Sequence, residues 1–442
     1  MSFTRALRAV GAAAAAGALL FAAAPTASAD QVRDDQWVLS AFSADKIWDV
    51  ATGKGVTVAV IDEGVDANHP DLKGNVLAGK DFKSGDDDAS PEDGDSHGTG
   101  MAGDIAAHGH GANGENGVKG LAPEAKILPI RDFGGDCFVR SIRYAVDHGA
   151  QVINISQTAS SCADKSSVLK AIAYADGKGV PVVVSSGNEG KNADDVLPVS
   201  YPGIVGVGAV SRSGEIWSKS NYGDSVLLTA PGDGIVSTGS GPSGYAKSDG
   251  TSDATAYVSS ALALLKQKFP ELSAGQLVNR LAKTAGLPAS AKGTSLPDEH
   301  YGYGFIQPLA ALTKDVPAGS KNGPLKIDQL NAAVGKTSSD GASAPSSSSP
   351  DAASDSGGIS TGLIIGIAAG VLVVLAIVVI VIMRSRKNNG GGPPPPPGGG
   401  WGGGGNQPYA AQQPYPGSYP QQAPPAPGSY PQAPSQPPYG QQ

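Results

Sequence analysis

The chain has 442 residues, and 32 Lys and Arg against 40 Asp and Glu give it a formal net charge of -8. This acidic balance gives no general electrostatic reason to bind nucleic acid. Two cysteines are too few for a cysteine-ligated zinc finger or a disulfide-dense small domain. The 62 glycines and 34 prolines exceed ordinary usage, so part of the chain is not expected to form a packed core.

The N-terminal residues 1–29 are typical of a secretory signal peptide. Two arginines precede an apolar stretch at 9–24, and the small residues 27–29 (ASA) form a cleavage site. The alternative is an uncleaved membrane anchor, but the short, Ala-rich stretch and the cleavage pattern favour export. We therefore expect residues 30–55 to form an N-terminal extension of the mature protein.

A second apolar segment, residues 362–383, is uncharged and rich in Leu, Ile and Val. As a helix it would be about 33 Å long, against roughly 30 Å of hydrocarbon, which favours a transmembrane helix over a buried soluble one. The basic residues of RSRK (384–387) follow directly and predict a cytoplasmic C-terminal side. The sequence thus predicts a single-pass type I protein of the cell membrane, in contact with lipid through this helix. An exported domain also favours a disulfide between Cys137 and Cys162.

The segments on either side of this helix have compositions that do not support a folded core. Residues 316–361 are rich in Ser, Ala and Pro, and we expect a flexible tether there. Residues 384–442 are rich in Pro, Gly and Gln and predict a disordered cytoplasmic tail. The tail either serves a partner that binds Pro-rich segments in a groove or has no dedicated partner.

The remaining segment, 56–315, alternates strand-like and helix-like runs. Six short runs rich in Val and Ile lack polar alternation, as is typical of parallel strands buried on both faces, namely 56–62, 126–130, 151–156, 180–186, 204–210 and 226–229. Helix-like stretches lie between or after them, at 138–148, 165–178 and 254–268. This alternation predicts an α/β fold, a parallel sheet with helices on both faces, whose chemistry gathers at the carboxyl ends of the strands.

Four polar residues lie at predicted strand ends or helix starts. Asp62 ends the run VAVID, His97 opens HGTGMAG, Asn188 follows a strand in SSGNEG, and Ser252 precedes a helix in GTSDATAY. Singly, each is explained as a cap. Together they supply nucleophilic catalysis: a hydroxyl, an imidazole to take its proton, a carboxylate to orient the imidazole, and an amide to bind an oxyanion.

The order Asp, His, Ser and the motifs around these residues resemble the subtilisin-like serine proteases, over about residues 45–312. The resemblance implies that Asp62, His97 and Ser252 form a catalytic triad, and that Asn188 and the Ser252 N–H form the oxyanion hole. The layout, with a signal peptide, QWVL near the start, paired cysteines and a C-terminal helix, resembles the mycosins, which are membrane-anchored subtilases associated with type VII secretion.

This resemblance implies an extracytoplasmic serine endopeptidase that acts on protein or peptide substrates and needs no cofactor. It also implies components of type VII secretion machinery as partners. The alternative from a different class is a catalytically weak or inactive structural subunit of the secretion complex.

The chain departs from the family's usual residues at positions that bear on rate. Glu63 follows the Asp where Ser or Thr is usual, and Asp253 follows the Ser where an apolar residue is usual. The strand that normally reads Ser-Leu-Gly reads Ser156-Gln157-Thr158, which the resemblance makes the substrate-binding residues. A carboxylate ~5 Å from the oxyanion would cost about 3 kcal/mol at an effective dielectric of ~20. We therefore expect a slow, selective protease unless Asp253 is hydrogen-bonded or turned to solvent.

Other polar clusters admit a structural interpretation. The acidic loop 86–95 could chelate calcium, but its spacing matches no EF-hand and favours a solvated loop. His108 and His110 lie in a Gly-rich run that favours a surface loop over a metal site, and no metal is predicted. Asp249 would join the two acidic departures in an acidic cleft that favours basic substrate residues.

Overall fold

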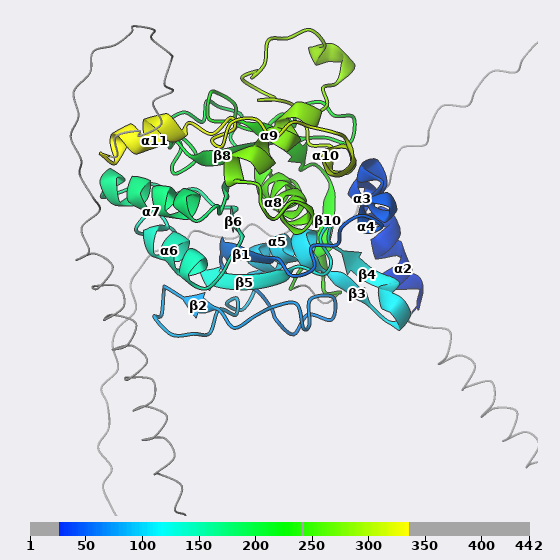
Figure 1. Cartoon of the computed structure of the whole chain (residues 1–442). Coiled ribbons are helices and arrows are strands. Elements are labelled where there is room, and N and C mark those ends of the chain that lie inside the picture. The colour runs from blue at the N-terminus through cyan, green and yellow to red at the C-terminus, as the bar shows by residue number, and fades with distance from the viewer. Residues whose placement is uncertain (1–25, 241–242, 336–442) are drawn as a thin grey trace, which may run out of the picture. The chain divides into compact units, whose positions relative to one another are not determined.

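The computed structural model describes residues 26–240 and 243–335, shown in colour in Figure 1. The predicted transmembrane helix (362–383) and the tail (384–442) lie outside the described residues, as do most of the signal peptide and the end of the tether. Within the described ranges, no helix combines the length and the apolar character that a bilayer crossing requires.

In the described part of the chain, seven strands form one sheet in the order β2-β5-β1-β6-β7-β8-β9, and every pairing in it is parallel. The central strands are buried along their whole length, which explains why their sequences lack polar alternation. The strand bounds are β1 Thr57–Asp62, β2 Lys80–Asp81, β5 Lys126–Arg131, β6 Val152–Ile155, β7 Val182–Ser185, β8 Ile204–Val210 and β9 Leu228–Pro231.

Helices cover both faces of this sheet, which confirms the predicted α/β class. The connection from β1 to β5 runs along the sheet in the direction opposite to those from β5 to β6 and from β6 to β7. Right-handed crossovers therefore place α5 on one face and α6 and α7 on the other. The helix α8 packs against α5 and strands β6 to β9 (Figure 1). The helices are α5 His97–Ala106, α6 Val139–Asp147, α7 Lys165–Gly177, α8 Thr251–Lys268, α9 Ala274–Thr284 and α10 Pro308–Thr313.

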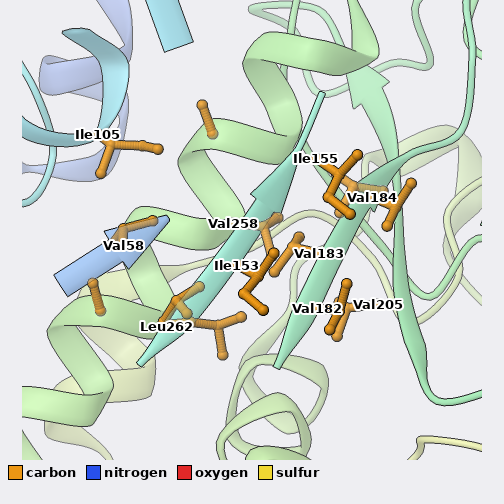
Figure 2. Close-up of a cluster of buried hydrophobic side chains, with 14 of the residues drawn as sticks. Val58, Ile105, Ile153, Ile155, Val182, Val183, Val184, Val205, Val258 and Leu262 are labelled. Atoms are coloured by element: carbon orange, nitrogen blue, oxygen red, sulfur yellow. The ribbon is translucent and has the colours of Figure 1, made fainter. Parts of the chain in front are cut away.

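The hydrophobic core lies between the sheet and its helices. Figure 2 shows Ile153 and Val183 of the strands beside Val258 and Leu262 of α8, with Ile105 of α5 nearby. All five side chains are fully buried. Because α8 packs so closely on the sheet, its first turn is held rigidly above the strand ends.

Two antiparallel hairpins and two short 3-10 helices, at Ala112–Gly114 and Ala289–Ala291, lie outside the main sheet of the described residues and were not anticipated. The first hairpin pairs β3 (His108–His110) with β4 (Asn116–Lys119), and the second pairs β10 (Ile235–Thr238) with β11 (Tyr245–Ser248). Their strands have three or four residues each, too few to show a clear hydrophobic period.

The N-terminal extension is folded onto the domain as three helices, α2 (Thr26–Asp35), α3 (Trp37–Phe42) and α4 (Ala44–Trp48). Arg33 Nε donates to the Gly117 carbonyl at 2.8 Å, and Trp37 Nε1 donates to the Gly234 carbonyl at 3.1 Å. The extension is therefore fixed to both hairpins. α2 continues across the predicted signal-cleavage point.

The predicted start of the tether at residue 316 is wrong. Helix α11 (Ile327–Ala333) packs against α7, and Leu325, Ile327 and Leu330 are buried. The composition of 316–361, averaged over the whole segment, concealed these three apolar side chains, which anchor the chain. The folded unit extends to at least residue 335.

The predicted disulfide is present. Cys137 and Cys162 are bonded, with their Cα atoms 5.3 Å apart. The bond ties the residues just before α6 to the loop before α7, so it fastens together two helices on the same face of the sheet.

The α11 anchor gives a stability test within one helix. Replacing buried Leu330 with Ala should lower the free energy of unfolding by about 2–5 kcal/mol, because it removes a fully buried side chain. Replacing its exposed neighbour Gln329 with Ala should change it little. Thermal melting of the two variants is the measurement. Equal melting temperatures would mean that α11 adds nothing to the domain.

Candidate active site

The end of β1 and the start of α5 bring a carboxylate and an imidazole together. Asp62, the last residue of β1, is fully buried, and its Oδ1 lies 2.7 Å from Nδ1 of His97, the first residue of α5. Asp62 Oδ1 also accepts from the Glu63 N–H at 2.8 Å. A Cβ at Gly98 would clash with the Gly64 carbonyl, so glycine is required for α5 to approach β1 this closely.

Ser252 lies in the first turn of α8 and is 7 % exposed. Its hydroxyl donates to the Ser156 carbonyl at 3.0 Å, and the Ser156 hydroxyl donates to the Ser252 carbonyl at 3.1 Å. The Ser252 hydroxyl is thus held by Ser156 and not by His97 in this structure. Proton transfer to His97 Nε2 requires the hydroxyl to leave that carbonyl and turn toward the imidazole.

Asn188 follows β7, and its side chain is oriented by Thr251. Asn188 Oδ1 accepts from the Thr251 N–H at 2.9 Å and from the Thr251 hydroxyl at 2.8 Å, which leaves Nδ2 as a donor. A Cβ built on Gly250 would lie 3.5 Å from both Asn188 Nδ2 and the Ser252 nitrogen. The two donors therefore border one space that glycine keeps open. The Ser252 N–H adds the positive end of an 18-residue helix to that space.

A cleft of about 390 Å³ joins these groups. Its wall includes His97, Ser252 and Asn188, while buried Asp62 lies behind His97. The predicted substrate-binding residues also line it, together with two acids and the supporting residues: Ser156, Gln157, Thr158, Glu63, Glu189, Ser185, Gly187 and Thr251. No residue of the folded extension 26–55 is among the described residues that line the cleft.

The predicted acidic cleft is only partly correct. Glu63 lines it, but Asp253 is 2 % exposed, and Asp249 accepts from the Gly234 N–H at 2.7 Å outside the lining. Glu189, which the sequence analysis did not single out, supplies the second acidic side chain. The cleft is therefore acidic through one predicted residue and one unexpected residue.

Residues 53–304 match the family model of the subtilases, peptidase S8. The chain belongs to the subtilase family. It is 38 % identical over 277 residues to a thermophilic serine proteinase of Bacillus sp. strain AK1, an alignment that covers 61 % of this chain and 65 % of that protein.

Two solved structures of similar proteins are mycosins. The crystal structure of MycP1 from Mycobacterium smegmatis has a TM-score of 0.56 and 30 % identity, covering 66 % of this chain and 88 % of that one. The MycP3 protease from the type VII (ESX-3) secretion system has a TM-score of 0.54 and 32 % identity, covering 63 % and 88 %.

The electrostatics of this subtilase favour a protonated imidazole. The buried Asp62 carboxylate raises the pKa of His97 to about 9, and Asp253 and Glu63 act in the same direction. Burial opposes the shift but is outweighed. Asp62 Oδ2 is buried and has no hydrogen-bond partner among the described residues, so this carboxylate is hydrogen-bonded there only through Oδ1, to His97 and to the Glu63 N–H. Burial and the charge of Asp62 raise the pKa of Glu63.

Asp253 is neither turned to solvent nor left without a donor. Its Oδ1 accepts from the Ser248 hydroxyl at 2.6 Å, and burial raises the pKa of Asp253 to about 6. This hydrogen bond from β11 therefore reduces the free-energy cost that the Asp253 carboxylate was expected to impose on the oxyanion.

The remaining polar motifs have structural roles. His110 Nδ1 lies 2.6 Å from Oδ1 of buried Asp71, which also accepts from the Val118 N–H and so holds the β3–β4 hairpin. In the acidic loop, Asp87 pairs with Lys80 at 2.8 Å, and Glu92 pairs with Lys83 and Arg131. Among the described residues there is no group of three or more His, Cys, Asp or Glu side chains that could hold a metal ion.

Sequence reasoning missed Thr251, Glu189 and Asp104. Thr251 directly precedes Ser252, so its position beside Asn188 follows from the same helix start. Asp104 lies seven residues after His97 on α5, which places the two side chains on one face, about two turns apart. That spacing was the available signal for an additional acid near the site.

The raised pKa of His97 predicts an alkaline enzyme. Below about pH 9 the imidazole is mostly protonated and cannot accept the Ser252 proton, so kcat/KM should rise with pH toward a midpoint near about 9. Replacing Glu63 with Gln removes a contributing charge and should lower the midpoint. Replacing Asp249 with Asn should leave the midpoint unchanged, because Asp249 is not among the groups that raise the pKa of His97. A wild-type midpoint near or below about pH 6.5 would contradict this assignment.

Proposed function

We propose that this subtilase is an endopeptidase that hydrolyses peptide bonds of protein substrates through Asp62, His97 and Ser252. The observation that carries the proposal is the Asp62–His97 hydrogen bond at 2.7 Å, with its imidazole in the same cleft as Ser252. Family membership supports the same reaction class.

In the proposed reaction, a substrate carbonyl enters the space beside Gly250. Ser252 transfers its hydroxyl proton to His97 Nε2 as its oxygen attacks the carbonyl carbon, and Asp62 stabilises the imidazolium that forms. Asn188 Nδ2 and the Ser252 N–H then donate to the oxyanion. His97 returns the proton to the leaving amine, and water, activated by the same imidazole, hydrolyses the acyl-enzyme.

We further propose that the protein is anchored in the cell membrane by residues 362–383, with its protease domain extracytoplasmic and 384–442 cytoplasmic. The apolar segment, the basic residues after it and the N-terminal export signal support this topology. Similarity to MycP1 and MycP3 supports an association with type VII secretion machinery.

The alternative function, a structural subunit with weak or no activity, also has an observation in its favour. The Ser252 hydroxyl is bound to the Ser156 carbonyl, and an acid, Asp253, directly follows the nucleophile. A resting hydroxyl in this position would need to reorient at each turnover.

Reaction with a fluorophosphonate distinguishes the two functions. We expect an adduct on Ser252 of the folded wild-type chain and none on Ser252→Ala, since only an activated hydroxyl reacts. Mass spectrometry of the labelled peptide is the measurement. Equal labelling of both proteins, or none on the wild type at any pH, would favour the structural subunit.

Replacing Asn188 with Ala should lower kcat by about 10²–10³-fold with a small effect on KM, because the donor acts on the oxyanion and not on the ground state. This magnitude is the loss that removal of the corresponding donor causes in subtilisin, a member of the same family. Lys191→Ala, an exposed change three residues away, is the control. An unchanged kcat for the Asn188 variant would exclude its side chain from the oxyanion hole.

A further inference from the structure

The central strand β6 contains one polar side chain, that of Asn154. Asn154 is fully buried, and its backbone lies in register between Val60 of β1 and Val183 of β7. Burial of an amide costs free energy unless both of its polar atoms are hydrogen-bonded, and Asn is uncommon in strands. An apolar residue would fill this core position at no such cost. The hydrogen bonds of Asn154 therefore need an explanation beyond packing.

Both polar atoms of the Asn154 amide are hydrogen-bonded to serine side chains. Asn154 Oδ1 accepts from the hydroxyl of Ser259 in α8 at 2.9 Å, and Asn154 Nδ2 donates to the Ser156 hydroxyl at 3.0 Å. Ser259 is fully buried and Ser156 is 4 % exposed. An amide accepts through its oxygen and donates through its nitrogen, so it joins the two hydroxyls in a fixed direction.

The Ser156 hydroxyl connects this amide to the backbone of the nucleophile. A serine hydroxyl has one proton, and because the Ser156 oxygen already accepts from Asn154, its proton is free for another acceptor. That acceptor is the Ser252 carbonyl, at 3.1 Å. Ser252 precedes Ser259 by seven residues, which places both on one face of α8, about two turns apart. The hydrogen bonds thus run from the body of α8 to β6 and back to the first turn of α8.

Two hydrogen bonds join Ser156 and Ser252, and the proposed reaction affects them differently. The Ser252 hydroxyl donates to the Ser156 carbonyl at 3.0 Å, and this bond must break when the hydroxyl turns toward His97. The bond from the Ser156 hydroxyl uses only the backbone carbonyl of Ser252. It does not have to break during that rotation, so it can hold the Ser252 backbone, including its N–H, while the side chain moves.

We propose that Asn154 is a positioning residue for Ser252. Through the Ser156 hydroxyl it fixes the first turn of α8 to the central strand, so that the nucleophile and the oxyanion-hole N–H keep their places as the Ser252 hydroxyl turns to His97. Asn154 is not among the described residues that line the cleft, so it acts through Ser156 and not on the substrate. This inference deepens the proposed function and rests on it for the effect on rate. The restraint on the helix start does not depend on turnover.

Three variants of the full chain test this role. Asn154→Ala removes the amide, and Ser156→Ala removes the hydroxyl but keeps the Ser156 carbonyl. The third variant combines both changes. Ser260→Ala is the matched control, because Ser260 is a fully buried serine of α8 whose hydroxyl donates to the Ala256 carbonyl at 2.7 Å, outside this set of bonds.

Three quantities are measured for each variant. The first is kcat and KM on a peptide substrate as a function of pH. The second is the rate of fluorophosphonate labelling of Ser252. The third is the rate of backbone hydrogen–deuterium exchange in the peptide that contains the first turn of α8, followed by mass spectrometry. Thermal melting shows which variants fold.

For Asn154→Ala we expect kcat and the labelling rate to fall by about ten- to a hundredfold, since a small displacement of a reacting group has effects of this size. KM should change little, and the pH midpoint should stay where it is in the wild type, because no charge is removed. Exchange in the first turn of α8 should become faster. The double variant should be no slower than the slower single variant, because both changes break one series of bonds. Ser260→Ala should match the wild type in all three measurements.

If Asn154→Ala does not fold, Ser259→Ala replaces it in the comparison. This variant removes only the hydroxyl that holds the amide oxygen, and we expect the same changes in smaller size, again with Ser260→Ala as the control.

Wild-type exchange in the first turn of α8 together with a wild-type labelling rate would overturn the positioning role. Independent, multiplicative losses in the double variant would also overturn it, because Asn154 would then not act through Ser156. A shifted pH midpoint would mean that the rate loss comes from His97 and not from placement of Ser252. Absence of Ser252 labelling in the wild type would contradict the proposed protease function alone, since amide exchange would still report on the restraint.

Discussion

The contact between the end of β1 and the first turn of α5 is the constraint on which the site depends. Asp62 lies at the carboxyl edge of the parallel sheet, and His97 lies at the start of a helix that begins at that edge. Their 2.7 Å hydrogen bond requires the two backbones to approach closely. Gly98 permits this approach, because any Cβ there would clash with the Gly64 carbonyl. The first turn of α8, held by the core beneath it, then brings Ser252 and its N–H to the same edge.

Buried carboxyl groups are the second feature that shapes the site. Asp62, Asp104 and Asp253 are all buried, although burying a carboxylate costs free energy. The surroundings differ at each position: the imidazole hydrogen-bonds to Asp62, burial raises the pKa of Asp104, and the Ser248 hydroxyl and a helix N-terminus stabilise Asp253. Of the three, Asp62 and Asp253 raise the pKa of His97, so their burial beside the imidazole also affects the pH range of activity.

The two ends of the folded unit pack against the domain at places outside the cleft. The extension helices bind the β3–β4 and β10–β11 hairpins through Arg33 and Trp37, and the β10–β11 hairpin also carries Ser248, the donor to Asp253. At the other end, α11 packs on α7 on the far side of the sheet from α5. Among the described residues, none of 26–55 lines the cleft. The extension therefore supports the site without closing it.

The sequence by itself determined the parallel α/β class, the six principal strands, the disulfide and several residues that line the site, among them His97, Asn188 and Ser252, because buried strands and capped helix starts leave local patterns. Tertiary structure alone decided how those residues are held. The hydrogen bond of the Ser252 hydroxyl to Ser156, the orientation of Asn188 by Thr251 and the entry of Glu189 into the cleft all depend on segments that are distant in the chain. The sequence also did not predict that the folded domain extends to near residue 335. The three apolar side chains there lie in a polar segment, and only the tertiary structure supplies the surface that buries them.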